Sequence, residues 1–140
     1  MIKPIYPCLW FNREAKEAAE FYCSIFKNAR IIADTPMVVT FEINGTKFMG
    51  LNGGPHFKFN EAVSFVVDCD TQEEIDFYWT QLTAGGAESQ CGWLKDKYGV
   101  SWQIVPTILA QLVSDPARSE RVIAAFMQMK KFDIEKLKQA

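Results

Sequence analysis

Apolar and polar residues alternate along several short segments of the chain, and residues typical of turns separate these segments. A period of two places successive side chains on opposite faces of a strand, so this pattern predicts β-structure. We expect strands at residues 2–11, 30–34, 37–43, 46–51 and 62–69, and a hairpin of two strands over 91–105. Asn44-Gly45 is a typical two-residue hairpin turn between two of these strands.

In two longer segments the apolar residues recur every three or four positions, which predicts amphipathic helices. The first runs from about residue 13 to 26, with Asn12 as its expected N-cap. The second follows Asp70 or Thr71 and continues to about residue 82, where Gly85-Gly86 ends it. After residue 106 we expect a short helix at 107–113, a helix that begins at 114–116, and a final turn that Asp133 caps.

The last predicted hairpin contains the most informative strand. Its turn is Asp96-Lys97-Tyr98-Gly99, where Gly99 can adopt a positive φ without steric cost. Beyond the turn, alternation places Ser101, Gln103 and Val105 on one face and Trp102 and Ile104 on the other. Gln103 is a lone amide in an otherwise apolar strand, so it needs hydrogen-bond partners if it is buried.

The two halves of the chain repeat one another. Residues 8–11 match 64–67 and residues 20–22 match 76–78, both at an offset of 56 (64 − 8 and 76 − 20), and residues 45–49 match 99–103 at an offset of 54 (99 − 45). An ungapped offset across a strand and a helix favours duplication of a βαβββ unit. Neither unit alone is expected to bury its sheet, so the two should pair.

The expected fold class is therefore α+β, with two tandem βαβββ modules forming a curved mixed sheet around a cleft, followed by a C-terminal helical extension. The chain of 140 residues has the length of a single domain. Module one covers about residues 1–54, module two about 60–106, and the helical tail 107–140.

Composition narrows the function classes. The net charge is -2 with no long run of one sign, which argues against nucleic acid or an anionic membrane surface as a partner. No segment is apolar enough to span a bilayer, and Pro4 and Pro7 interrupt any signal-peptide core, so we expect a cytoplasmic protein. The four cysteines lack C-x-x-C spacing, which predicts reduced thiols and neither a zinc site nor a redox pair.

Several motifs together resemble a known family. The pattern D-x-x-G-x-x-W-Q-I over residues 96–104 ends the second module, and further matching segments lie at 8–11, 51–57, 91–96, 101–106 and 129–134. With the paired modules, they resemble the vicinal-oxygen-chelate superfamily of glyoxalase I, bleomycin-resistance proteins and extradiol dioxygenases. Within it they resemble the PhnB-like branch, whose members often carry the label 3-demethylubiquinone-9 3-methyltransferase.

The resemblance implies a place for a metal, at cavity-facing positions on the first and last strand of each module. Counted through the repeat, these positions are Tyr6, Met49, Ala62 and Gln103. A phenol, a thioether, a methyl group and a neutral amide do not replace the carboxylate and imidazole ligands that divalent ions require. We therefore expect no metal and no other cofactor. The only histidine, His56, lies in a loop, and local bonding to backbone is its expected role.

The methyltransferase label finds no support in the sequence, because no strand leads into a G-x-G turn that opens a helix, as binding of a nucleotide-like methyl donor usually requires. Instead the cleft is expected to bind a small molecule through aromatic walls and a few polar groups. The predicted ligand-binding residues are Tyr6, Cys8, Trp10, Met49, Ser64, Trp93 and Gln103, with Val66 and Ser101 also lining the cleft. For the loop with Asn52, His56 and Phe57 two roles stay open, a lid over the cleft or a linker between the modules.

Three functions stay open from the sequence. The first is metal-independent binding of a planar or aromatic small molecule. The second is an enzyme of unknown reaction that uses Cys8, His56 or Tyr6, although no base–nucleophile pair is visible and the catalytic residues are unknown. The third is a structural protein whose cleft is filled by its own side chains, the interpretation we favour for Met49 and Val66. The resemblance also implies a homodimer.

Overall fold

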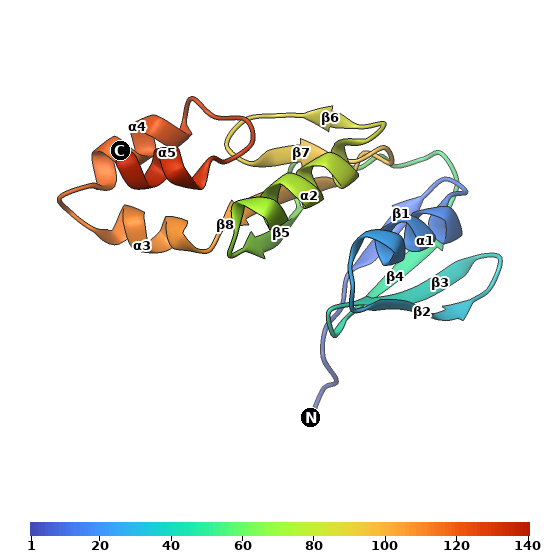
Figure 1. Cartoon of the computed structure of the whole chain (residues 1–140). Helices are drawn as coiled ribbons and strands as arrows, with labels where there is room; N and C mark the ends of the chain where they lie inside the picture. Colours follow the sequence, from blue (N-terminus) through green and yellow to red (C-terminus); the bar gives the residue numbers. More distant parts are fainter. The chain divides into compact units, whose positions relative to one another are not determined.

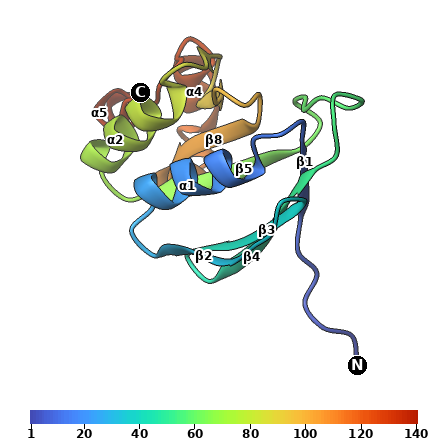
Figure 2. The same ribbon diagram turned by 90° about the vertical axis from the view of Figure 1, so that its right-hand side faces the viewer.

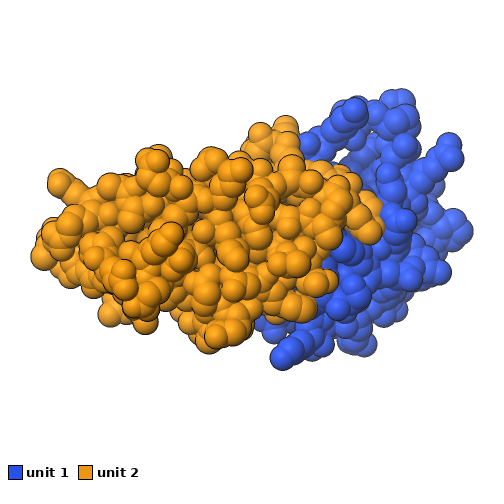
Figure 3. Space-filling model, turned by 45° about the horizontal axis from the view of Figure 1, so that its top comes forward, with its two compact units in different colours: residues 1–59 blue, residues 60–140 orange.

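The computed structural model describes all 140 residues. They form two compact units, residues 1–59 and residues 60–140 (Figure 3). Each unit has its own four-stranded sheet and its own helix after the first strand. The expected fold class is confirmed: the chain is α+β, it contains two βαβββ units in tandem, and helices follow the second unit.

The first unit contains β1 (Cys8–Phe11), α1 (Ala15–Ile25), β2 (Ala29–Asp34), β3 (Val38–Ile43) and β4 (Thr46–Asn52) (Figure 1). The strand order is β1-β4-β3-β2, with β1 parallel to β4 and the other neighbours antiparallel. Helix α1 packs on one face of this sheet (Figure 2).

The core of the first unit lies between α1 and the sheet. Val39, Phe41 and Ile43 alternate along β3 as buried residues, and the Phe41 ring stacks on Phe48 of β4 with centroids 5.4 Å apart. From the helix, Tyr22 is fully buried and its ring lies 6.1 Å from that of Phe41. The opposite face of the sheet is covered by no helix of this unit, because α1 is its only helix.

The second unit repeats this plan with β5 (Ser64–Cys69), α2 (Gln72–Thr83), β6 (Ala87–Glu88), β7 (Trp93–Lys95) and β8 (Ser101–Pro106). The order is β5-β8-β7-β6, with β5 parallel to β8 and the rest antiparallel. Helix α2 contacts β5, β7 and β8. Its buried Ile75 and Trp79 share the core with Leu94, Trp102 and Ile104.

A buried carboxylate holds the hairpin of β7 and β8 together. Asp96 is only 2% exposed; its Oδ1 accepts hydrogen bonds from the backbone N–H groups of Tyr98 (2.9 Å) and Val100 (3.1 Å). Its Oδ2 accepts from the indole N–H of Trp102 at 2.9 Å. The predicted turn is confirmed, since the Gly99 N–H bonds to the Asp96 carbonyl and Gly99 has φ +89°.

Three helices complete the second unit: α3 (Ile108–Ser114), α4 (Ser119–Phe126) and α5 (Ile134–Gln139). The segment before α5 joins the unit through backbone and side chain. The N–H groups of Cys91 and Gly92 donate to the carbonyls of Met129 and Lys130, both at 2.8 Å. Phe132 is 2% exposed and lies so close to Gly92 that an added Cβ would overlap its ring.

Two side chains set the starts of α2 and α5. Thr71 forms a capping box with Glu74, as the sequence predicted for Asp70 or Thr71, and Asp133 caps α5 through the Lys136 N–H. Gln72 then links the two helices, because its amide donates to the Phe132 carbonyl and accepts from the Ile134 N–H. The tail is thereby fixed to α2.

Some predicted boundaries are wrong. Strand β1 begins at Cys8 rather than residue 2, because Pro4 and Pro7 have no N–H to donate to a ladder. Strand β5 begins at Ser64 rather than Ala62, since Asn60 accepts the Ala62 N–H in a local turn. The first strand of the predicted hairpin begins at Trp93 rather than Cys91, because Cys91 lies in a turn with φ +57°.

Two helix starts also differ from the prediction. Glu14, not Asn12, is the N-cap of α1, and the first helical N–H, that of Ala15, donates to Asn52 Oδ1 from the end of β4. Helix α4 begins at Ser119, because the Asp115 carbonyl accepts from Arg118 and Ser119 in a preceding turn. No helix of the chain combines the length and the hydropathy that crossing a membrane requires.

Candidate functional site

The face of the second sheet that points away from α2 carries most of the polar candidates. In the ladder, Ser64 lies opposite Ser101 and Val66 opposite Gln103. Across the next pair of strands, Gln103 lies opposite Trp93 and Ser101 opposite Lys95. Because directly paired residues share a face, these six side chains form one continuous surface.

Gln103 has one of the partners that a half-buried amide needs. Its Nε2 donates to Ser64 Oγ at 2.9 Å, across the parallel strands β5 and β8. The sequence predicted both residues for the cleft, and the structure brings them together. This bond fixes the orientation of the amide and leaves its carbonyl oxygen available as an acceptor at the surface of the sheet.

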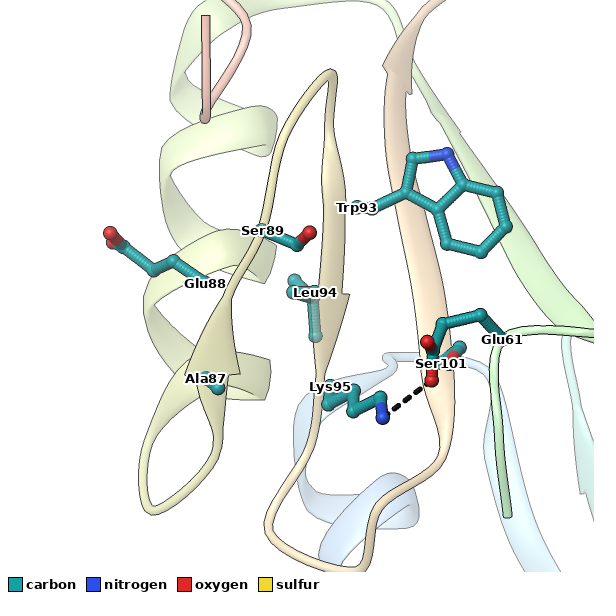
Figure 4. Close-up of a pocket in the computed structure, with 8 residues that line it drawn as sticks. All are labelled: Glu61, Ala87, Glu88, Ser89, Trp93, Leu94, Lys95 and Ser101. Carbon is teal, nitrogen blue, oxygen red and sulfur yellow. Dashed lines mark ion pairs between the residues drawn. The ribbon is translucent and has the colours of Figure 1, made fainter.

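A hollow of about 270 Å³ lies at β7, where Trp93, the ladder neighbour of Gln103, lines it (Figure 4). It approaches the smaller end of the range typical of ligand pockets. Trp93 provides an aromatic wall, and Ser101, at 1% exposure, is the most buried polar group. The residues that line it are Glu61, Ala87, Glu88, Ser89, Trp93, Leu94, Lys95 and Ser101.

Two of the charged residues that line the hollow, Lys95 and Glu61, form an ion pair. Lys95 Nζ lies 2.5 Å from Glu61 Oε1, and both side chains remain substantially exposed, at 42% and 63%. The hydrogen bond from Lys95, together with its positive charge, lowers the pKa of the Glu61 carboxyl. The second acid is directed elsewhere, because Glu88 accepts the indole N–H of Trp79 at 2.9 Å on the side of α2 (Figure 4).

The first unit places three candidates on the corresponding face of its own sheet. Cys8 lies opposite Met49 and Trp10 opposite Leu51, while Leu9 and Phe11 point into the core. The Trp10 indole N–H donates to the Gly54 carbonyl at 3.0 Å, and its ring lies 4.9 Å from that of Phe57, edge to face. The ring of Trp10 is therefore packed against its own loop.

The predicted lid has a fixed part and an exposed part. Asn52 is held at both ends of its amide, since Oδ1 accepts from Ala15 and Nδ2 donates to the Pro36 carbonyl at 3.0 Å. The next two residues contact β1, because the Gly53 N–H donates to the Phe11 carbonyl and the Gly54 carbonyl accepts from the Trp10 indole. His56 and Phe57 are exposed, and Phe57 retains 65% of its accessible surface.

Tyr6 and Cys8 have environments that limit their chemistry. Tyr6 precedes β1 and is 38% exposed, and Lys47 Nζ lies 4.1 Å from the centroid of its ring. Desolvation by neighbouring atoms raises the pKa of the Cys8 thiol, so at neutral pH the sulfur is protonated. A protonated thiol is a poor nucleophile, and this weakens the case for Cys8 in catalysis.

The positions that the resemblance implied for a metal do not fit one. Tyr6 and Ala62 precede their strands, and a thioether at Met49 and an amide at Gln103 supply no anionic donor. Nowhere in the chain do three or more His, Cys, Asp or Glu side chains form a group suited to a metal ion.

The repeat matched Gln103 of β8 to Met49 of β4, and this match is wrong. Relative to the first strand of each module, Gln103 occupies the register of Leu51 rather than Met49, because Val66 and Trp10 are equivalent. The turn that joins β3 to β4 has two residues, whereas five separate β7 from β8. An alignment that starts from the glycine of each turn therefore shifts β8 by two residues relative to β4. Because the shift is two residues, Met49 and Leu51 lie on the same face of the sheet.

Lys95, Glu61 and Asp96 were not among the predicted site residues. A signal for Lys95 existed, since it stands two positions from Trp93 and shares its face by alternation. Glu61 lies in the segment between the modules, where no periodicity points to a partner. Asp96 was read as a turn residue, and only tertiary structure shows that its carboxylate is buried under Trp102.

Comparison with known proteins identifies the family. The family model described as 3-demethylubiquinone-9 3-methyltransferase matches residues 3–105. A PhnB protein from Bacillus cereus, described with the same methyltransferase name, is similar to 75% of this chain over 100% of its own length, with 33% identity and a TM-score of 0.69. No curated protein matches the chain.

More distant solved structures share the fold. The fosfomycin resistance protein FosX from Listeria monocytogenes, solved with Mn(II) and sulfate, is 18% identical, with 80% of this chain and 97% of that one covered and a TM-score of 0.60. A glyoxalase-related enzyme from Fulvimarina pelagi is 12% identical, with 77% and 91% covered and a TM-score of 0.56. The chain therefore belongs to the 3-demethylubiquinone-9 3-methyltransferase family, to which the similar PhnB protein is also assigned by its description.

Proposed function

We propose that this chain is a metal-independent binding protein for a small planar or aromatic molecule. The observation that carries the proposal is the surface of the second sheet, where the half-buried Trp93 lines a hollow of about 270 Å³ and lies opposite Gln103, whose amide donates to Ser64. Stacking on the indole supplies affinity, and the Gln103 carbonyl orients a donor on the ligand. The family name alone does not decide the activity, because one fold supports many functions.

Two features argue against methyl transfer as the activity. The strand-to-helix turns, at residues 12–14 and 70–71, contain no glycine, and both sheets mix parallel and antiparallel strands. Sites for nucleotide-like cofactors usually combine a glycine-rich turn with a parallel sheet. We therefore keep binding ahead of catalysis, with an enzyme acting through Cys8, His56 or Tyr6 as the second candidate.

The first unit carries the other predicted ligand-binding residues, Tyr6, Cys8, Trp10 and Met49, on or near its own sheet, and His56 and Phe57 belong to the exposed part of the predicted lid. We also propose that the protein is cytoplasmic and forms a homodimer, the latter on the family resemblance. Its modules would be 1–54 and 60–106, with a helical tail at 107–140.

A thermal-shift screen of planar metabolites and antibiotics tests the proposal, because a ligand in excess of its dissociation constant raises apparent stability. Compounds that raise Tm are tested again on Trp93→Ala and Gln103→Leu, with Gln128→Leu as the matched control at an exposed glutamine. We expect both site variants to lose the shift and the control to keep it. A screen without active compounds, or active compounds indifferent to both variants, would refute it.

The enzyme alternative has a separate test. Because the Cys8 thiol is protonated at neutral pH, alkylation by iodoacetamide at that residue should be slow at pH 7 and should accelerate above pH 9. Rapid labelling at pH 7, with loss of any turnover in Cys8→Ser, would instead favour a catalytic thiol.

A further inference from the structure

The ion pair at the hollow indicates the charge of the ligand. Lys95 is the one cationic side chain among the eight residues that line it. Its partner, Glu61, comes from the segment before β5 and places a carboxylate oxygen 2.5 Å from Nζ. Of the acids that line the hollow, Glu88 is bound to the Trp79 indole, so Glu61 alone neutralises Lys95.

We propose that the hollow takes a planar aromatic acid, whose carboxylate replaces that of Glu61 on Lys95 while its ring lies against Trp93. The inference rests on the proposed binding function and concerns the same face of the second sheet. In the free protein, the Glu61 carboxylate occupies the position on Lys95 that the acidic group of the ligand takes on binding.

The geometry of the face supports this arrangement. Lys95 and Trp93 are two residues apart on β7 and so project from the same side of the sheet, about 7 Å apart along the strand. That spacing suits an aromatic ring with a carboxylate attached directly to it. Their partners on β8 are Ser101 and Gln103, which add a hydroxyl and an amide carbonyl next to the charge and the ring.

Replacement of Glu61 is energetically accessible. Both members of the pair are exposed to water, and pairs of this kind contribute little net stability because water and salt screen them. The Glu61 side chain lies on a turn rather than in a strand or helix, so it can leave without breaking a ladder. The hydroxyl of Ser101 makes only a long hydrogen bond, 3.4 Å to the Asn60 carbonyl, and can turn toward the ligand.

The test compares two probes that differ only in charge, 2-naphthoate and 2-naphthamide. Both are titrated into the full chain while the indole N–H of Trp93 and the side-chain amide of Gln103 are followed by ¹H–¹⁵N NMR. We expect naphthoate to bind at least about fivefold more tightly than naphthamide at low salt, and the difference to shrink as salt is added. The same spectra verify that each variant is folded.

Three variants identify the residues responsible for the tighter binding of naphthoate. Lys95→Met should remove the preference for the acid, and Glu61→Gln should raise affinity for naphthoate by about two- to fivefold, leaving naphthamide unchanged, because the competing carboxylate is gone. Lys58→Met, at an exposed lysine outside the hollow, is the matched control and should behave as the wild type.

The outcomes separate this inference from the function on which it rests. Equal binding of the two probes at Trp93, or a preference for the acid that survives in Lys95→Met, would overturn the anionic ligand but keep a planar-ligand site. Binding of neither probe would overturn both.

Discussion

The substitution Asp96→Asn tests how the ligand-binding strand is held in place. The side chain is nearly isosteric, so its carbonyl oxygen can still accept from the Tyr98 and Val100 N–H groups. Its amide nitrogen must then face the indole N–H of Trp102, a donor against a donor, where the wild type has a hydrogen bond of 2.9 Å. The variant loses a charge-assisted bond and leaves a buried donor unsatisfied.

The expected cost is about 2–4 kcal/mol in the free energy of unfolding, since buried hydrogen bonds to charged groups contribute roughly 1.5–3 kcal/mol and an unsatisfied partner adds to this. The assay is urea denaturation of the full chain followed by far-UV circular dichroism. Hydrogen exchange of the Tyr98 and Val100 amides gives a local measure. Asp68→Asn, at an exposed aspartate of β5, is the matched control, with an expected change within about 0.5 kcal/mol.

A double-mutant cycle isolates the contact. In a Trp102→Phe background the donor is absent, so Asp96→Asn should cost about 1.5–3 kcal/mol less than in the wild type. Additive effects, within about 0.5 kcal/mol, would show that the carboxylate does not act through the indole and would refute the reasoning.

Three further predictions concern the second unit. Gly92→Ala should undock the tail, measured as faster hydrogen exchange in α5, because its Cβ would overlap the Phe132 ring and lie 2.8 Å from the Ile104 carbonyl, at a backbone φ of +82°. Thr71→Ala should lower the free energy of unfolding by about 1 kcal/mol in urea denaturation, since the capping box with Glu74 is lost. Burial raises the pKa of the Cys69 thiol to about 12. Because the unfolded thiol ionises near pH 9 and the folded one does not, stability should be unaffected below pH 8 and fall between about pH 9 and 12, and Cys69→Ala should reduce this fall.

The elements that the sequence predicted correctly are those whose hydrophobic period is long enough to measure. Strand β3 has six residues that alternate regularly, and α2 has its cap and its apolar stripe within one segment. Strand β6 was missed because two residues contain no period. The start of α1 depends on Asn52, which is 37 positions away, so no local signal could replace Asn12 with the true acceptor.

The site was predictable only where alternation and composition agree. Gln103, Ser64 and Trp93 stood out as polar or aromatic residues on apolar strands, and the ladder places them on one surface. A charged residue on a strand is usually interpreted as exposed to solvent, which is why Lys95 was passed over. Its role depends on Glu61, 34 positions earlier, and pairing at that distance leaves no trace in the local pattern.

The difference between the two modules explains why the ligand is better sought on the second. Duplication gives each sheet an equivalent open face, but Trp10 on the first is occupied: Gly53 lies directly against the indole, Gly54 accepts its N–H, and Phe57 meets its edge. Its equivalent, Val66, is small and 55% exposed, so the second face is not filled from within. Because a loop already covers the Trp10 ring, little of its surface remains for a ligand to bury. A ring beside a hollow, with an amide and a replaceable ion pair next to it, still has surface to bury.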